Sequence, residues 1–260
     1  MGKEIICKPE HNQRIKNLIN AVRELTPGQI AWLENTVRVF RFPHKFEIFQ
    51  DGLLDASTLE NFGDALRIHH SFSAEPFSKD KFEYVLEKVI NFNRKRAHLS
   101  SKGNPGHDIT IDGVPVSLKT QADKSIREEK ISISKFMELG KGIWGNNPED
   151  LSLLRKMFFA HMESYERIFT LRALRKAPDW TYELVEIPKS LLALAETGRL
   201  EMKSGSKQSP KPGYCYVQRN GVELFQLYFD GGTERKLQVK NLLKSECIVH
   251  ARWAFSIPKE

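Results

Sequence analysis

An Asp-Gly turn between two short, alternating apolar segments constrains the fold of this chain more than any other sequence feature. Residues 105–121 read Pro-Gly-His-Asp-Ile-Thr-Ile-Asp-Gly-Val-Pro-Val-Ser-Leu-Lys-Thr-Gln. Because Asp-Gly accommodates the backbone angles of a two-residue turn, Asp112-Gly113 predicts a β-hairpin with a fixed register. In that register Ile109 lies opposite Val116, and Asp108 lies opposite Ser117.

The hairpin sorts its side chains onto two faces, because side chains alternate along a strand. We expect the apolar face to be buried: Ile109, Ile111, Val114, Val116 and Leu118. We expect the polar face to be solvated: Asp108, Thr110, Ser117, Lys119 and Gln121. Diagonal neighbours lie about 7–8 Å apart, so Asp108 and Lys119 can act on one metal ion or one water. The polar face is compatible with a structural ion pair or with a phosphodiester-cleaving Mg²⁺ site.

Composition narrows the class of protein. The 260 residues suffice for one sizeable core, and 40% hydrophobic and 28% charged residues are ordinary for a soluble globular protein. The net charge of +7 favours a polyanionic partner. Neither a membrane-spanning apolar segment nor a signal peptide is apparent. The three cysteines (Cys7, Cys215 and Cys247) are widely spaced, so we expect reduced thiols in the cytoplasm.

Periodicity predicts an α/β (α+β) protein with a mixed central sheet flanked by helices. Residues 1–75 read as a mostly helical N-terminal region for scaffolding or dimerisation. Residues 76–260 read as a catalytic and DNA-recognition core within one compact unit. Helices are expected at about 12–25, 29–40, 57–68, 79–93, 135–140, 147–165 and 188–197. Strands are expected at 131–134, 166–173, 180–187, 214–217, 222–229 and 247–255, besides the hairpin.

Several charged residues outside the hairpin are candidates for the same chemistry. Glu83 lies at the edge of the apolar stripe of its helix. It is either a solvated carboxylate or an additional metal ligand. Arg94 begins a basic loop that leads to Asp108 and suits contact with a DNA backbone.

Two later loops are candidates for contact with DNA. The polar loop 204–213 contains Lys207, Gln208 and Lys211, and reads as a solvated linker or as a DNA-contacting loop. The loop 230–236 contains Glu234, Arg235 and Lys236. Arginine and lysine match guanine O6 and N7, and glutamate accepts from cytosine N4, so we expect base contacts from this loop and from the loop 204–214.

With Asp108, Ser117 and Lys119 as its motif, the chain resembles the PD-(D/E)xK nuclease superfamily. More narrowly, it resembles the SmaI-like type II restriction endonucleases from about Phe62 onward. The narrower resemblance is carried by Asn104-Pro-Gly-His-Asp-Ile-Thr-Ile-Asp112, Leu118-Lys-Thr120, Met137-Glu-Leu-Gly-Lys-Gly142, Glu166-Arg-Ile-Phe-Thr-Leu-Arg172, Leu184-Val-Glu-Ile-Pro-Lys-Ser-Leu-Leu192, Ser204-Gly-Ser-Lys-Gln-Ser-Pro-Lys-Pro-Gly-Tyr214 and Leu227-Tyr-Phe-Asp-Gly-Gly232.

The resemblance implies a restriction-endonuclease-like core and Mg²⁺-dependent cleavage of double-stranded DNA. It implies the palindrome CCCGGG as the target and products with 5′-phosphate and 3′-hydroxyl ends. A palindromic target is matched most simply by a C₂ homodimer. The family resemblance also implies a cognate DNA methyltransferase, which protects the same DNA site and need not bind this chain.

The same resemblance assigns roles to individual residues. Asp108 corresponds to the metal-binding aspartate and Lys119 to the motif lysine, while Ser117 replaces the usual middle carboxylate. Glu83 or Glu138 would then supply the second carboxylate, with Glu83 preferred for its position just upstream of the hairpin. The Leu118 carbonyl is a further candidate metal ligand, and Gln121 a supporting residue of the catalytic site.

Two other functions are compatible with the sequence. One is a repair or structure-specific nuclease of the same fold, which would cut branched or mismatched DNA. The other is a catalytically inactive, sequence-specific DNA-binding protein, in which Ser117 marks a lost active site.

Overall fold

The computed structural model describes residues 9–49, 52–93, 95–101, 106–123, 125–140 and 144–258. The chain divides into two compact units, Met1–Phe42 and Pro43–Glu260. None of the helices in the described segments combines the length and the apolar character required to cross a bilayer.

The first unit contains two amphipathic helices, α1 (Pro9–Arg23) and α2 (Pro27–Arg41). α2 begins with a capping box in which Thr26 Oγ1 accepts from the Gln29 N–H and the Gln29 side chain accepts from the Thr26 N–H. Both helices expose large apolar side chains: Ile15, Leu18, Ile19, Trp32, Val37 and Phe40. The role of residues 1–75 as a scaffold or dimer contact stays a prediction.

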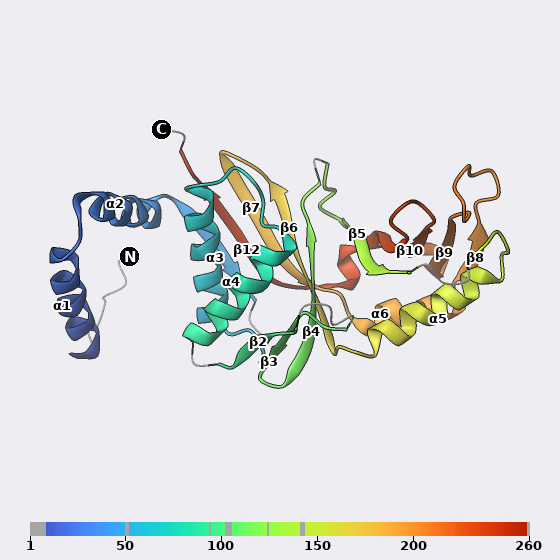
Figure 1. Cartoon of the computed structure of the whole chain (residues 1–260), viewed down its shortest axis with the longest axis horizontal. Helices are drawn as coiled ribbons and strands as arrows, with labels where there is room; N and C mark the ends of the chain where they lie inside the picture. The colour runs from blue at the N-terminus through green and yellow to red at the C-terminus, as the bar shows by residue number, and fades with distance from the viewer. Residues whose placement is uncertain are drawn as a thin grey trace. The chain divides into compact units, whose positions relative to one another are not determined.

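A seven-stranded sheet organises the second unit, in the order β1-β12-β7-β6-β4-β3-β2. β4 and β6 pair in parallel, and the other neighbouring strands pair antiparallel, which makes the sheet mixed. Helices α3 and α4 lie side by side over one face of it (Figure 1). The bounds are β1 His44–Ile48, α3 Ala56–His70, α4 Lys79–Phe92, β2 Ala97–Leu99, β3 Ile109–Ile111, β4 Val114–Gln121, β6 Arg167–Arg175, β7 Asp179–Glu186 and β12 Ile248–Ser256.

A second, five-stranded antiparallel sheet has the order β5-β11-β10-β9-β8. Helix α5 lies along this sheet (Figure 1), and its residues share a core with the sheet and with Ile168 and Val185 of β6 and β7. The remaining bounds are β5 Lys130–Glu138, α5 Asp150–Met162, α6 Lys189–Ala193, β8 Arg199–Met202, β9 Gly213–Arg219, β10 Val222–Asp230 and β11 Lys236–Leu243, with 3₁₀ turns at Leu194–Thr197 and Lys244–Glu246. The expected α+β class is confirmed.

The hairpin prediction is confirmed in its turn and register. Asp112 and Gly113 have φ angles of 46° and 86°, and Ile109 pairs with Val116. The expected solvation of the polar face is wrong. Lys119 is 6% exposed because β5 lies over that face, with the Phe136 ring centroid 5.2 Å from Lys119 Nζ.

The helix expected at residues 135–140 is also wrong, because that segment continues β5. The strand pairs with β11, and the register shifts between the Met137–Leu237 and Ile133–Val239 pairs. This shift breaks the alternation of buried side chains between Ile133 and Phe136, so the period-2 signal ends at Ser134. Pairing with a distant strand decides the conformation here.

Other boundaries shift for local reasons. α5 starts at Asp150 instead of near Asn147, because Asp150 Oδ2 accepts from the Gly145 and Asn147 N–H groups and forms a turn ahead of the helix. Four strands lay outside the sequence expectations: β1, β2, β8 and β11. Three of these have five residues or fewer, too few for a clear alternation pattern.

A buried ion pair joins the sheet to the segment that leads into β5. Arg172 of β6 binds the Glu183 carboxylate and Gln121 Oε1, and both charged side chains are at most 1% exposed. The guanidinium also donates to three backbone carbonyls at the start of β5: those of Arg127 and Glu128, just before the strand, and of Lys130, its first residue. Arg172 therefore fixes where the second sheet begins.

Replacing Arg172 with Met should destabilise the protein by about 3 kcal/mol, because its buried acceptors lose the guanidinium and Glu183 keeps only Lys244, at 3.2 Å, as a cationic partner. Urea unfolding followed by circular dichroism measures the loss. Arg175→Met, at the exposed end of the same strand, should change the free energy of unfolding by less than about 0.5 kcal/mol. Equal effects of the two substitutions would contradict a supporting role for Arg172.

Candidate active site

Asp108 is held by the hairpin in one orientation. Its Oδ2 accepts from the Leu118 N–H at 2.6 Å and from Ser117 Oγ at 3.1 Å. Its Oδ1 lies 2.6 Å from Lys79 Nζ. Burial acts to raise the pKa of Asp108, but Lys119, Lys79 and the Leu118 N–H outweigh it and hold the pKa below its ordinary value. Asp108 is therefore a preoriented carboxylate, and Ser117 is its hydrogen-bond donor.

Lys119 is a nearly buried amine beside that carboxylate. Burial lowers the pKa of Lys119 to about 8, with Asp108 opposing the shift and Lys79 adding to it. A lysine with a pKa near the working pH can exchange a proton with a bound water. The structure thus brings Asp108, just before β3, and Lys119 of β4 together on one face of the hairpin, as the register predicts.

Helix α4 adds two charged residues to the site. Lys79 Nζ contacts both Asp108 Oδ1 and Glu83 Oε1, the latter at 3.2 Å. Burial raises the pKa of Glu83, and the nearby negative charge of Asp108 adds to the rise. Burial also acts to lower the pKa of Lys79, but Asp108 and Glu83 together outweigh it and raise that pKa. Glu83 thus lies close to Asp108, whereas Lys79 went unrecognised in the sequence.

A cavity of about 670 Å³ opens at this group of residues. Its lining includes Asp108, Lys119, Lys79 and, on the β5 side, Lys135 and Glu138. Glu138 forms an ion pair with Lys135 at 2.7 Å, and its side chain is 70% exposed. Glu83 is the more buried candidate for the second carboxylate, and it shares a cation with Asp108, so the geometry favours Glu83.

The donor atoms at the site suit a hard divalent cation. Asp108 and Glu83 already converge on one positive charge, that of Lys79 Nζ. The N–H and C=O of a strand residue point to the same edge, so the Leu118 carbonyl faces the side on which its N–H meets Asp108. Mg²⁺ prefers such oxygen ligands and retains several waters. Among the described residues, no cluster of three His, Cys, Asp or Glu side chains suits a metal. The ligand set that fits a divalent cation here is therefore two carboxylates, Asp108 and Glu83, and the Leu118 carbonyl.

Two predicted site residues are not brought into this group. Gln121 Oε1 accepts from Arg172 Nε at 2.8 Å, so its recorded hydrogen bond belongs to the buried ion pair and not to Asp108 or Lys119. Arg94 lies outside the described residues.

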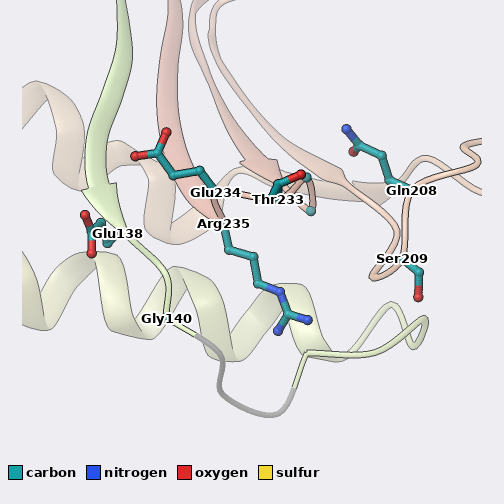
Figure 2. Close-up of a pocket in the computed structure, with 9 residues that line it drawn as sticks. Glu138, Gly140, Gln208, Ser209, Thr233, Glu234 and Arg235 are labelled. Atoms are coloured by element: carbon teal, nitrogen blue, oxygen red, sulfur yellow. The ribbon is translucent and has the colours of Figure 1, made fainter.

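Three of the DNA-binding candidates, Gln208, Glu234 and Arg235, line a second cavity of about 790 Å³. Figure 2 shows Glu138 and Glu234 on one side, Gln208 and Ser209 on the other, and the Arg235 side chain extending between them. Lys207 and Lys211 lie on the same loop as Gln208, and Lys236 follows Arg235 at the start of β11.

The two loops that form this cavity pack closely together. A Cβ atom at Gly231 would lie 2.0 Å from the Pro210 carbonyl oxygen, so only glycine allows the approach. Glu234 forms ion pairs with Lys135 at 2.5 Å and Lys236 at 3.2 Å, and the hydrogen bond from Lys135 is the largest cause of its lowered pKa. Glu138 lines both cavities, so they share a wall at the end of β5.

Comparison with known proteins identifies the family. The family model described as "SmaI: Type II site-specific deoxyribonuclease" matches residues 37–255. The type II restriction enzyme SmaI of Serratia marcescens is 49% identical over 215 residues, which covers 82% of this chain and 83% of that protein. The chain belongs to the SmaI family of type II site-specific deoxyribonucleases.

Membership in the SmaI family makes the chain a restriction endonuclease, that is, a hydrolase that acts on DNA. Enzymes of this type generally need a divalent metal. The match begins at Val37, so α1 and most of α2 precede the part that the family model covers.

Sequence reasoning overlooked Lys79 for an identifiable reason. Lys79 is the first residue of α4, directly after the N-cap Ser78, and Glu83 follows it by one helical turn. The spacing of four residues signals a helical ion pair. Nothing local signals the contact with Asp108, which lies 29 positions along the chain.

Replacing Lys119 with Met should abolish cleavage and raise the stability of the folded protein. The folded pKa of about 8 lies below the ordinary value of 10.5, so below pH 8 the buried ammonium destabilises the folded state. Removing it should raise the free energy of unfolding at pH 7 by up to about 3 kcal/mol.

Urea unfolding at pH 7 and at pH 10.5 measures this effect, which should be largest at pH 7 and vanish near pH 10.5. Lys88→Met, an exposed position on α4, is the control and should change stability by less than about 0.5 kcal/mol. A Lys119→Met protein that still cuts DNA, or that is strongly destabilised, would refute the assigned role.

Proposed function

We propose that this chain is a Mg²⁺-dependent endonuclease that cuts both DNA strands at the palindrome CCCGGG and leaves 5′-phosphate ends. The observation that carries the proposal is that Asp108 and Lys119 line one cavity, while Glu83 shares the Lys79 ammonium with Asp108. The choice of target is supported by the relationship to the type II restriction enzyme SmaI, which is 49% identical to this chain.

Each residue of the site has a defined part in the proposed reaction. Asp108, Glu83 and the Leu118 carbonyl would hold Mg²⁺, which when bound supplies a water of lowered pKa and neutralises charge on the phosphate. Lys119 orients the attacking water, accepts or shares its proton, and stabilises the negative charge that develops on the phosphoryl oxygens. Attack at phosphorus in line with the 3′ oxygen breaks the P–O3′ bond, which places the phosphate on the 5′ end.

Glu138 is the alternative second carboxylate. It lines the same cavity, but its ion pair with Lys135 and its exposure direct it toward the outer part of the cavity. Gln121 would contribute indirectly, because its contact with Arg172 fixes the end of the strand that carries Lys119.

Base recognition is proposed for the second cavity. Arg235 can donate two hydrogen bonds to guanine O6 and N7, and Glu234 can accept from cytosine N4. Lys207 and Lys211 lie on one loop of this cavity and Lys236 follows the other loop at the start of β11, and all three would contact phosphates, as would Arg94. Gln208 donates to Asp230 at 3.4 Å, a weak bond that a base edge could replace.

The assembly and the cellular setting complete the proposal. A homodimer would present two such sites to the two strands of a palindrome. The N-terminal helices would act as a scaffold or a dimer contact, because both expose large apolar residues. The enzyme would work in the cytoplasm, where a methyltransferase modifies the same site on the host DNA.

A plasmid with a single CCCGGG site should become linear when the protein and Mg²⁺ are added, and should stay intact in EDTA or with Asp108→Ala. Mapping the ends of the linear product identifies the cut bond and the terminal phosphates. Fragments that persist with Asp108→Ala would show that the site is misassigned.

The two rival functions give other results in the same experiment. A structure-specific or repair nuclease would leave the intact plasmid without discrete products and would cut a branched substrate. An inactive binding protein would retard the CCCGGG fragment on a gel and never cut it.

Replacing Arg235 with Gln should weaken binding to CCCGGG DNA by about 1–3 kcal/mol, because the bidentate contact to guanine is lost. Binding to unrelated DNA should change little. Lys207→Gln is the matched control, since loss of a phosphate contact should weaken binding to both DNAs alike and lower the salt dependence. Fluorescence anisotropy in Ca²⁺ at several salt concentrations measures both. Equal loss on both DNAs for Arg235→Gln would exclude base reading.

A further inference from the structure

Lys79 occupies the position between the two carboxylates that a divalent cation would need. Its Nζ lies 2.6 Å from Asp108 Oδ1 and 3.2 Å from Glu83 Oε1. The Lys79 side chain is 43% exposed, whereas those of Asp108 and Glu83 are 17% and 19% exposed. The ammonium therefore reaches inward from the rim of the cavity to two partners that are largely withdrawn from water.

We propose that Lys79 is an internal counter-ion that a divalent metal must displace before it can bind. The inference rests on the proposed function, because it takes Asp108 and Glu83 as metal ligands. An ammonium and a divalent cation repel each other strongly when both contact the same carboxylate oxygens. The metal-free site is thus held together by a competitor that belongs to the chain itself.

Displacement gives Lys79 a second role at the same cavity. The side chain starts at the first residue of α4 and lines the cavity with Asp108 and Lys119. Once released, its ammonium is within the region where a DNA phosphate would lie beside the metal. DNA therefore offers Lys79 a new partner, which favours displacement and makes metal binding tighter when DNA is present. By linkage, the metal strengthens DNA binding by the same factor.

The test is the affinity of the full-length protein for Mn²⁺ without DNA, measured by titration with electron paramagnetic resonance of the free ion. Lys79→Met removes the charge and keeps the length of the side chain, and should bind Mn²⁺ about tenfold more tightly than the unaltered protein. Lys81→Met makes the same charge change on an exposed position of α4, and should leave the affinity unchanged. Lys79→Gln is a second variant, and should follow Lys79→Met.

Addition of uncleavable phosphorothioate CCCGGG DNA supplies a second readout. DNA should tighten Mn²⁺ binding to the unaltered protein more than to Lys79→Met, while cleavage of normal DNA by Lys79→Met falls. Opposite changes in metal affinity and cleavage distinguish a displaced counter-ion from a residue that merely supports the fold.

The outcomes separate this inference from the proposed function. If Asp108→Asn abolishes Mn²⁺ binding but Lys79→Met and Lys79→Gln bind no more tightly than the unaltered protein, the counter-ion role is overturned and the metal site stands. An equal gain in Lys81→Met would also overturn it, because the effect would then be general electrostatics. If Asp108→Asn binds Mn²⁺ normally, the metal site itself is wrong.

Discussion

The buried contact between Arg172 and Glu183 is the interaction on which the site depends. The guanidinium satisfies a carboxylate, an amide oxygen and three backbone carbonyls at once, so nearly all its donors are used without water. Those carbonyls belong to the turn that starts β5, and β5 carries Phe136 over Lys119. The ion pair therefore ties the start of β5 to the hairpin sheet, while pairing with β11 holds the rest of the strand over the polar face.

Enclosure decides the chemistry of the site. A solvated lysine opposite an aspartate is an ordinary surface pair, worth little to stability and unsuited to proton transfer at neutral pH. Under β5 the same lysine has a pKa of about 8. The unfavourable free energy of burying the Lys119 charge is partly offset by the negative charge of Asp108, which two hydrogen bonds from β4 hold beside it. The strand that gives the site its reactivity also makes it a source of instability.

The sequence predicted the parts of the site whose signals are local. An Asp-Gly turn fixes its own register, so the positions of Asp108 and Lys119 followed from a few adjacent residues. The polarity of their surroundings did not follow, because β5 approaches from a different sheet. The same long-range pairing with β11 misled the prediction for residues 135–140, where six residues with no clear alternation resemble a short helix.

Glu83 and Lys79 illustrate the same limit at the level of single residues. The helical stripe placed Glu83 at the edge of the buried face of α4, which made it a candidate ligand. The sequence preferred Glu83 over Glu138 only for its position just upstream of the hairpin, whereas the packing of α4 against the hairpin adds a physical reason, because it brings Lys79 to both carboxylates. A carboxylate on a helix is informative only when the tertiary structure supplies its partner.

Lys135 gives the two cavities a common electrostatic element. Its ammonium binds Glu138 at 2.7 Å and Glu234 at 2.5 Å, and these carboxylates belong respectively to the wall shared by both cavities and to the loop proposed for base reading. A base edge bound by Glu234, as proposed above, would compete with Lys135 for the same carboxylate. Through its two ion pairs, Lys135 is thus a direct contact between the residue that lines both cavities and the loop that carries Arg235.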